Sequence, residues 1–340
     1  MSNDFGYVNA RVRGMSSKLL GADVFDAALA APDFDAFTSL LSSSPYASAL
    51  DEARSDTPGL RAVDRALASS LRATTRSMLA FSDGTPRMMI AALLRRNDLE
   101  DLKTIARALH AGRADALEGG IDAGALGGLG ELRPSVLEAM ADAADLPSAA
   151  QRLAVSKHPL SPAFTRAARA YASDGDLLAF EVALDRAAFA ELSREAQRLG
   201  SDLFIAYVRR EIDAANLRTA LKLEGRPDDA EALFVPGGRE VSQTLYGQIV
   251  EAGIDGLSKL GGGTFASVAQ AADASEAERA IRAALDAAAK RAALRDPLGI
   301  GVVIRYLRAR EAEAAKLRLL ARGAYYRVPR ADLERELGHA

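Results

Sequence analysis

The residue types that most often catalyse reactions or bind metals are scarce in this sequence of 340 residues. Cysteine is absent, and the three histidines stand far apart, at His110, His158 and His339. None of them has a partner at the spacing that brings two imidazoles together on one helix face to bind zinc. A nucleophilic site would need serine with lysine or a carboxylate, and no local motif provides this. The sequence therefore predicts no catalytic residue, no metal site and no cofactor.

Glycine-rich stretches are the next candidates, because glycine loops can bind phosphate groups. They are LEGGIDAGALGGLGEL at 117–132, PGGRE at 236–240 and LGGGTFAS at 260–267. A phosphate loop lies between a strand and a helix, and in the Walker pattern it ends in Gly-Lys-Ser or Gly-Lys-Thr. None of these stretches has that context. We expect turns at all of them, with a loop or linker at 117–132.

Carboxylates are numerous, and most of them lie close in sequence to arginine or lysine. Asp98, Glu100 and Asp101 are typical, since Arg95, Arg96 and Lys103 are close by. Charges mixed in this way usually lie on the solvated face of a helix. We therefore expect these three carboxylates to be exposed, and we do not expect them to act as acid–base pairs.

Two charged pairs differ from this pattern because they recur. Glu211 and Arg218 have the same types and the same spacing as Glu311 and Arg318 in a similar segment. Residues seven apart lie two helical turns from each other, so they share a face but are too distant to pair directly. An unpaired buried charge is costly. We therefore predict that each of the four forms a structural ion pair with another helix.

The segments that position these residues are expected to be long helices. Within 298–322, the residues Val303, Leu307, Ala314, Leu317 and Ala321 form one apolar stripe at helical intervals. Pro297 is expected near the first turn with Asp296 as a cap, and Gly323 is expected to end the helix in a left-handed conformation.

Similar sequences recur along the chain. The segment 201–224 aligns with 298–322, since Glu211, Leu217 and Arg218 match residues 311, 317 and 318. A weaker copy at 86–109 aligns Asp101 with Asn216, although Arg96 stands where the others have glutamate. A spacing of roughly 100–115 residues is too long for a solenoid repeat. The sequence therefore predicts three related helical domains in tandem, at 1–117, 118–225 and 226–340.

Other segments are also expected to be helical. Asp33 is predicted to cap one helix, 59–82 and 174–199 read as amphipathic helices, and a last helix is expected to follow Pro329. No alternating strand pattern is found. Aromatic residues make up only 6% of the chain and tryptophan is absent, which favours helices over sheets. The predicted fold class is all-α.

Charge and hydropathy restrict the possible partners. Lysine and arginine number 43 against 46 aspartate and glutamate, which argues against bulk nucleic-acid binding. No apolar run approaches the length of a membrane span, so we expect no insertion into the bilayer and a cytoplasmic location. The C-terminal region is locally basic, with eight lysines and arginines between residues 304 and 330 against Glu311 and Glu313. This excess fits either a solvated helix face or a docking surface for an acidic partner.

Four stretches carry a family resemblance: YVNARVRGM at 7–15, EIDAANLRTALK at 211–222, FVPGG at 234–238 and VIRYLRAREAEAAKLRLLARG at 303–323. Together they resemble the C subunit of the bacterial and archaeal V-type (A-type) rotary ATPase, the relative of the d subunit of the eukaryotic enzyme. The resemblance extends over the whole chain, and the last stretch is the most specific. The departure at Arg96 places strict equivalence of the three domains in question.

The resemblance implies a funnel-like, pseudo-threefold arrangement of three helical domains. It also implies a non-enzymatic role in the central stalk, as a socket on the cytoplasmic end of the membrane rotor ring. The socket would receive the D and F subunits of the central shaft and transmit torque for coupled ion transport and ATP synthesis or hydrolysis.

Charge complementarity fixes the register of an interface more than its affinity. On this ground Arg11, Arg305 and Arg308, together with Arg318, are candidate contacts to acidic partner surfaces. Two alternatives stay open from the sequence: an all-helical adaptor unrelated to rotary ATPases, and an enzyme with an unrecognised site.

Overall fold

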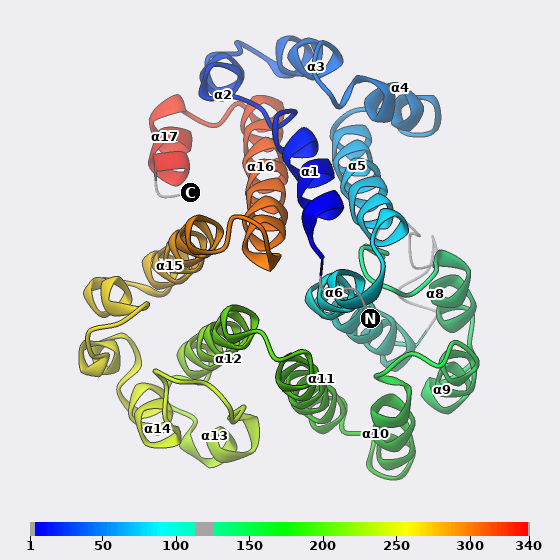
Figure 1. Cartoon of the computed structure of the whole chain (residues 1–340), viewed down its shortest axis with the longest axis vertical. Helices are drawn as coiled ribbons and strands as arrows, with labels where there is room; N and C mark the ends of the chain where they lie inside the picture. The colour runs from blue at the N-terminus through cyan, green and yellow to red at the C-terminus, as the bar shows by residue number, and fades with distance from the viewer. Residues whose placement is uncertain (1–3, 113–125, 339–340) are drawn as a thin grey trace. The chain divides into compact units, whose positions relative to one another are not determined.

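The computed structural model describes residues 4–112 and 126–338, and in these residues every regular element is a helix (Figure 1). They form sixteen α-helices and two short 3-10 helices. The prediction of an all-α protein is therefore confirmed for this part of the chain. None of these helices combines the length and apolar character needed to cross a membrane.

The chain divides into two compact units. The first contains residues 1–86 and 286–340, and the second contains residues 87–285. The three-domain division stays a prediction, because the boundary at 117/118 lies outside the described residues.

The first unit is built on α1, α5 and α16, which lie side by side (Figure 1). Its helices are α1 (Gly6–Ser16), α2 (Ala22–Leu29), α3 (Phe34–Ser42), α4 (Ala47–Asp56), α5 (Leu60–Phe81), α16 (Ile300–Tyr326) and α17 (Arg330–Gly338). A core of fully buried apolar side chains joins α3, α4, α5 and α16, and it includes Phe37, Leu50, Leu67, Leu317 and Leu320.

The second unit contains two apolar cores. One packs α6 against α8–α11 and includes Leu102, Ile105, Leu153 and Phe164; the other packs α12 against α14 and α15 and includes Leu217, Ile249, Phe265 and Ile281. The helices are α6 (Gly84–His110), α8 (Pro134–Ala141), α9 (Leu146–Val155), α10 (Ser161–Asp174), α11 (Leu177–Leu199), α12 (Asp202–Lys222), α13 (Pro227–Leu233), α14 (Gln243–Ala252) and α15 (Ala274–Arg295), with 3-10 helices at Gly253–Lys259 and Ala266–Gln270. The unit boundaries fall within α6 and α15.

Several helix ends lie where the sequence places them. Asp33 caps α3, since its Oδ1 accepts the Ala36 N–H at 2.8 Å. α5 covers nearly the whole of the predicted 59–82, and α17 begins directly after Pro329. The predicted helix at 174–199 is α11, which begins three residues later, at Leu177, because Gly175 ends α10 in the left-handed conformation at φ +70° and Asp176 caps α11.

Both predicted ends of α16 are wrong. The helix starts at Ile300, after a turn that α1 holds: Arg13 donates to the Pro297 carbonyl and Asn9 to the Gly299 carbonyl, at 2.6 and 3.2 Å. Asp296 and Pro297 therefore precede the helix. Gly323 lies buried inside α16, where Leu333 of α17 packs so closely that it would overlap a Cβ. The helix continues to Tyr326, and Arg327 takes the left-handed conformation at its end.

Gly301 is a second glycine required by close packing, and it provides a test of the α15–α16 contact. A Cβ at this position would lie 2.6 Å from the Ala292 carbonyl oxygen, which is backbone and cannot swing away. Alanine gains up to about 1 kcal/mol of helix propensity over glycine, but overpacking costs about 1–3 kcal/mol. We predict that Gly301→Ala lowers the thermal unfolding midpoint.

Gly14 of α1 is the matched control, because a Cβ there would meet no atom within 4 Å. Gly14→Ala should leave the midpoint unchanged or raise it. A Gly301→Ala protein at least as stable as wild type would show that α15 and α16 do not approach each other this closely.

Candidate functional site

Three of the long helices carry a buried acidic residue at the same position of the aligned repeats. They are Asp98 in α6, Asp213 in α12 and Glu313 in α16, with exposed fractions of 0%, 0% and 6%. Their spacings of 115 and 100 residues are those that align the three segments. A buried carboxylate is costly unless its oxygens accept hydrogen bonds, so the donors to these three residues define the main polar contacts of the fold.

Asp213 accepts hydrogen bonds from the backbone of the turn that follows α13. The N–H groups of Arg239, Glu240 and Val241 donate to its two oxygens at 2.9–3.0 Å. Burial raises the pKa of this carboxyl, and the three donors offset only part of that rise. Gly238 is required here, because a Cβ would lie 2.1 Å from Oδ1 of Asp213. The glycine-rich turn at 236–240 therefore surrounds the protein's own carboxylate with N–H groups, as such turns can do for a bound anion.

Asn216, one helical turn further along α12, fixes the same segment. Its side-chain amide donates to the Val235 carbonyl at 2.8 Å and accepts the Val235 N–H at 2.9 Å. The side chains of Asn216 and Asp213 are both fully buried. Together they attach residues 235–241 to two successive turns of α12 in the protein interior.

Asp98 makes the equivalent contact from α6. It accepts the N–H groups of Glu131 and Leu132 at 2.9 and 3.0 Å. Its Oδ2 also lies 3.2 Å from Nε2 of His158. Gly130 lies against this carboxylate, so closely that a Cβ would overlap it.

The prediction that Asp98 and Asp101 are exposed is wrong, whereas Glu100 is exposed as expected. Asp101 accepts the N–H groups of Gly127 and Gly128 at 2.7 and 2.8 Å. The described part of the glycine-rich stretch, residues 126–132, is thus packed against α6, while the rest of the predicted linker at 117–125 lies outside the described residues.

Glu313 of α16 joins separate parts of the first unit. Its Oε2 accepts the Leu20 N–H at 2.6 Å, and its Oε1 accepts bonds from the Tyr46 hydroxyl at 2.8 Å and from Arg310 at 2.6 Å. The Arg310 guanidinium also donates to Tyr46 and to Ser70, and it lies over the Tyr46 ring. Burial raises the pKa of Tyr46, so the hydroxyl keeps its proton and donates.

The histidines contribute no reactive pair of their own. In His158, Nδ1 accepts the Leu160 N–H at 3.3 Å, so Nε2 carries the proton of the neutral ring and donates to Asp98. Both ring nitrogens are thus engaged in structural bonds. His110 contacts the Tyr171 hydroxyl, and His339 lies outside the described residues. Across residues 4–112 and 126–338, no group of three metal-ligating side chains comes together.

In the second unit, the recurring charged residues Arg218 and Glu211 lie at helix contacts. Arg218 donates to both oxygens of Glu278 in α15 at 2.7 and 3.1 Å. Burial alone would raise the pKa of Glu278, but Arg218 and Arg282 together lower it. Glu211 accepts a bond from the Tyr207 hydroxyl, and Arg96 of α6 approaches it to 3.9 Å. The residue that breaks the glutamate pattern in the first repeat therefore faces the glutamate of the second.

In the first unit, Arg318 of α16 lies beside α5. The Arg318 Nε lies 3.8 Å from Oδ1 of Asp64 in α5, and Arg322 lies 3.3 Å from Oδ2 of the same carboxylate. Glu311 is half-buried. The role of Glu211, Arg218, Glu311 and Arg318 as structural ion-pair residues stays a prediction.

The candidate partner contacts occupy dissimilar positions. Arg305 is exposed and forms no ion pair with any described residue. Arg11 is exposed and lies over the Phe81 ring at 5.2 Å. Arg308, in contrast, is directed into the first unit, where its Nε pairs with Asp286 at 2.5 Å and only 10% of its side chain is exposed. Arg305 and Arg11 are therefore accessible at the surface, whereas most of the Arg308 side chain is covered.

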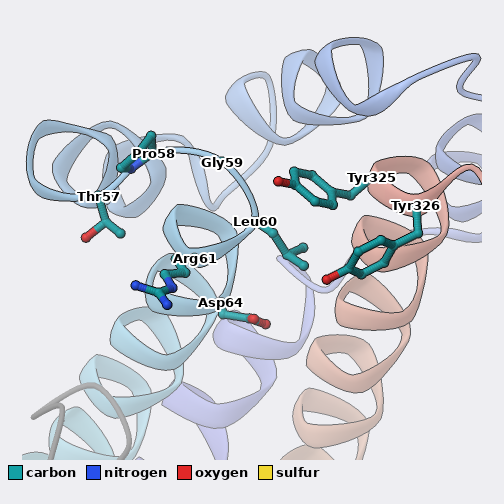
Figure 2. Close-up of a pocket in the computed structure, with 8 residues that line it drawn as sticks. All are labelled: Thr57, Pro58, Gly59, Leu60, Arg61, Asp64, Tyr325 and Tyr326. Atoms are coloured by element: carbon teal, nitrogen blue, oxygen red, sulfur yellow. The ribbon is translucent and has the colours of Figure 1, made fainter. Parts of the chain in front are cut away.

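A pocket of about 550 Å³ opens between the start of α5 and the end of α16 (Figure 2). Its walls are Thr57, Pro58, Gly59, Leu60, Arg61 and Asp64 on one side and Tyr325 and Tyr326 on the other. The pocket thus includes the carboxylate that faces Arg318 and Arg322.

The repeats were predicted from the sequence, but the buried acidic residue that they share was not. The alignment that pairs Glu211 with Glu311 also pairs Asp213 with Glu313, and it pairs both with Asp98. The position of Asp98, Asp213 and Glu313 is acidic in all three segments, whereas the position two residues earlier is not. This shared acidic position was the sequence signal that could have identified the buried residues. The neighbouring glycines at 130 and 238 were a second signal, since each lies against one of these carboxylates.

The fold and these contacts define an all-helical protein built on long helices that share a buried acidic position. Comparison with known proteins agrees with this description. The family described as ATP synthase (C/AC39) subunit matches residues 8–336. The chain is 38% identical to the C subunit of the V-type ATP synthase of Deinococcus radiodurans, over 99% of this chain and 92% of that protein.

More distant relatives match over a similar length. The chain is 36% identical to the C subunit of the V-type ATP synthase of Thermus thermophilus, over 99% of both proteins. It is 26% identical to the C subunit of the A-type ATP synthase of Halobacterium salinarum, over 98% of this chain and 97% of that protein. The chain therefore belongs to the family of the C subunits of V-type and A-type ATP synthases.

Removal of one buried carboxylate tests its role directly. Asp213→Ala leaves three N–H groups of the 239–241 turn without their acceptor; that of Val241 is buried, and those of Arg239 and Glu240 are partly buried. Each unsatisfied buried group costs about 1–3 kcal/mol. We predict that the free energy of unfolding, measured by urea denaturation, falls by about 2 kcal/mol or more.

Asp202→Ala is the matched control, because Asp202 lies exposed in the first turn of the same helix. Its loss should cost less than about 1 kcal/mol, the usual contribution of an acid to the helix dipole. Equal losses for the two variants would show that the Asp213 contacts contribute little to stability.

Proposed function

We propose that this chain is the non-catalytic socket of a V-type or A-type ATP synthase, which joins the central shaft to the membrane rotor ring. In this role it transmits torque between the ATP-hydrolysing or ATP-synthesising head and the ion-translocating ring. The observation that carries the proposal is the match to C-subunit proteins over nearly the full chain. The partners that follow from it are the D and F subunits of the shaft and the rotor ring, at the cytoplasmic face of the membrane.

The lengths of the helices support a mechanical role. α6 and α16 each contain 27 residues, which corresponds to about 40 Å of helix. Asp98 and Glu313 attach other segments to the sides of these two helices through buried and partly buried hydrogen bonds. A part that transmits rotation must resist bending, and cross-links between long helices and their neighbours provide that resistance.

The repeated acidic position supports the three-domain organisation. We propose that residues 1–117, 118–225 and 226–340 are three related helical domains arranged as a pseudo-threefold funnel. Asp98, Asp213 and Glu313 each hold a non-helical segment through backbone N–H groups, which favours a common origin of the three long helices.

The charged residues support a structural role over a catalytic one. Asp98, Asp213 and Glu313 direct their oxygens at the backbone and at neighbouring side chains of the chain itself. Family membership also argues against an adaptor unrelated to rotary ATPases.

Arg305 is the proposed contact to an acidic partner surface, because its guanidinium is exposed and carries no ion pair among the described residues. Arg11, exposed on α1, is a second candidate. Arg308 serves less well as a probe, since charge reversal there would place a carboxylate beside Asp286 and disturb folding.

Reconstitution tests the function. We predict that membranes from cells that lack this chain hydrolyse ATP without ATP-driven ion pumping, and that added wild-type chain restores the pumping. We predict that Arg305→Glu restores it less well, with roughly tenfold weaker binding to the stripped membranes, since a reversed charge at an interface costs about 1.4 kcal/mol or more.

Arg291→Glu is the control, because Arg291 is also exposed and forms no ion pair with a described residue. Normal pumping without the chain would refute the torque role. Normal binding of Arg305→Glu with intact pumping would remove only the contact assigned to Arg305.

A further inference from the structure

Two exposed tyrosines line the pocket between α5 and α16. The consecutive residues Tyr325 and Tyr326 are 48% and 66% exposed. Figure 2 shows both rings on the α16 side of the pocket, opposite Leu60 and Asp64 of α5. Exposed tyrosines in a concave site are characteristic of protein interfaces, because they bury a large area for a small loss of side-chain entropy.

The aromatic wall is held in place by the first unit. Tyr325 packs edge-on against Phe34 of α3, with 5.2 Å between ring centroids, and against Tyr326 at 5.1 Å. The opposite wall is the short segment 57–59 and the first two turns of the 22-residue helix α5. A site that is formed before binding loses less entropy when it is occupied.

The charges around the pocket are predominantly positive. Asp64 is the one acidic residue of its walls, and two arginines, Arg318 and Arg322, lie within 4 Å of its carboxylate. Arg61 lines the pocket, is exposed and has no ion-pair partner among the described residues. Arg327, directly after Tyr326, is also exposed and unpaired within the described chain. The site therefore has an excess of cations, although the whole chain has a net charge of −3.

We propose that this pocket binds an acidic segment of a neighbouring protein, with an apolar side chain against Tyr325 and Tyr326 and a carboxylate beside Arg61. The inference rests on the proposed function, since the neighbour is another member of the rotary complex. Arginine pairs with carboxylates through two parallel N–H bonds, and tyrosine accepts apolar groups on its ring. These two chemistries lie side by side in the pocket, and they fit a protein segment better than a lipid surface, which needs only positive charge.

Site-directed photo-crosslinking tests the proposal. The full-length chain with Tyr326→p-benzoylphenylalanine is expressed as the sole copy, and its native membranes are irradiated. Mass spectrometry then maps the crosslinked peptide. We predict one protein partner, joined within a segment that carries aspartate or glutamate next to an apolar residue.

Charge reversal at Arg61 in the same crosslinking chain tests whether this arginine binds the acidic segment. Arg61→Glu should lower the crosslinking yield roughly tenfold, and Arg61→Lys should restore part of it. The matched control Arg291→Glu, an exposed arginine on α15, should leave the yield unchanged. Higher salt should also lower the yield, because the attraction is electrostatic.

The proposal is overturned by a crosslink to lipid, to a second copy of this chain or to a segment without acidic residues. It is equally overturned by the absence of a crosslink, or by a yield that Arg61→Glu does not change. Copurification of the same chain with the rotary complex is measured in parallel. If the chain copurifies but the pocket forms no such crosslink, only the pocket proposal fails; if the chain does not copurify, the proposed function fails as well.

Discussion

A carboxylate buried inside a helical protein needs hydrogen-bond donors. The segment that supplies these donors is held in place by its hydrogen bonds to the carboxylate. Asp98, Asp213 and Glu313 impose this constraint at one position of three long helices. Most of their donors are backbone N–H groups of segments without regular structure, at 2.6–3.0 Å. Such segments have no helical bonds of their own, so the buried acids replace the partners that a helix would provide.

The helices could be predicted from the sequence, but the contacts between them could not. Periodicity and caps predict helix type well, as at Asp33 and in α5, because both are local properties. The ends of α16 were missed because they depend on distant residues: Asn9 and Arg13 hold its start, and Leu333 packs on Gly323. Burial of Asp98 was missed for the same reason, since its donors lie more than 30 residues away.

The arginines separate into two groups by their surroundings. Arg218, Arg308 and Arg310 face carboxylates of their own unit, where they neutralise charge that would otherwise be unpaired. Arg61 and Arg305 are exposed and unpaired within the described chain. The first group explains how long helices with many charges pack together, and the second provides surfaces that a member of an assembly presents to its neighbours. The sequence alone could not distinguish the paired arginines from the exposed ones, because both groups lie on helices among similar neighbouring residues.

Native-state hydrogen exchange of three backbone amides tests the central claim most directly. Leu20, Leu132 and Val241 donate to Glu313, Asp98 and Asp213, respectively, from outside any helix. If the buried acids hold these segments, the three amides exchange as slowly as those in the middle of α12. Exchange at the rate of an exposed turn would contradict the account.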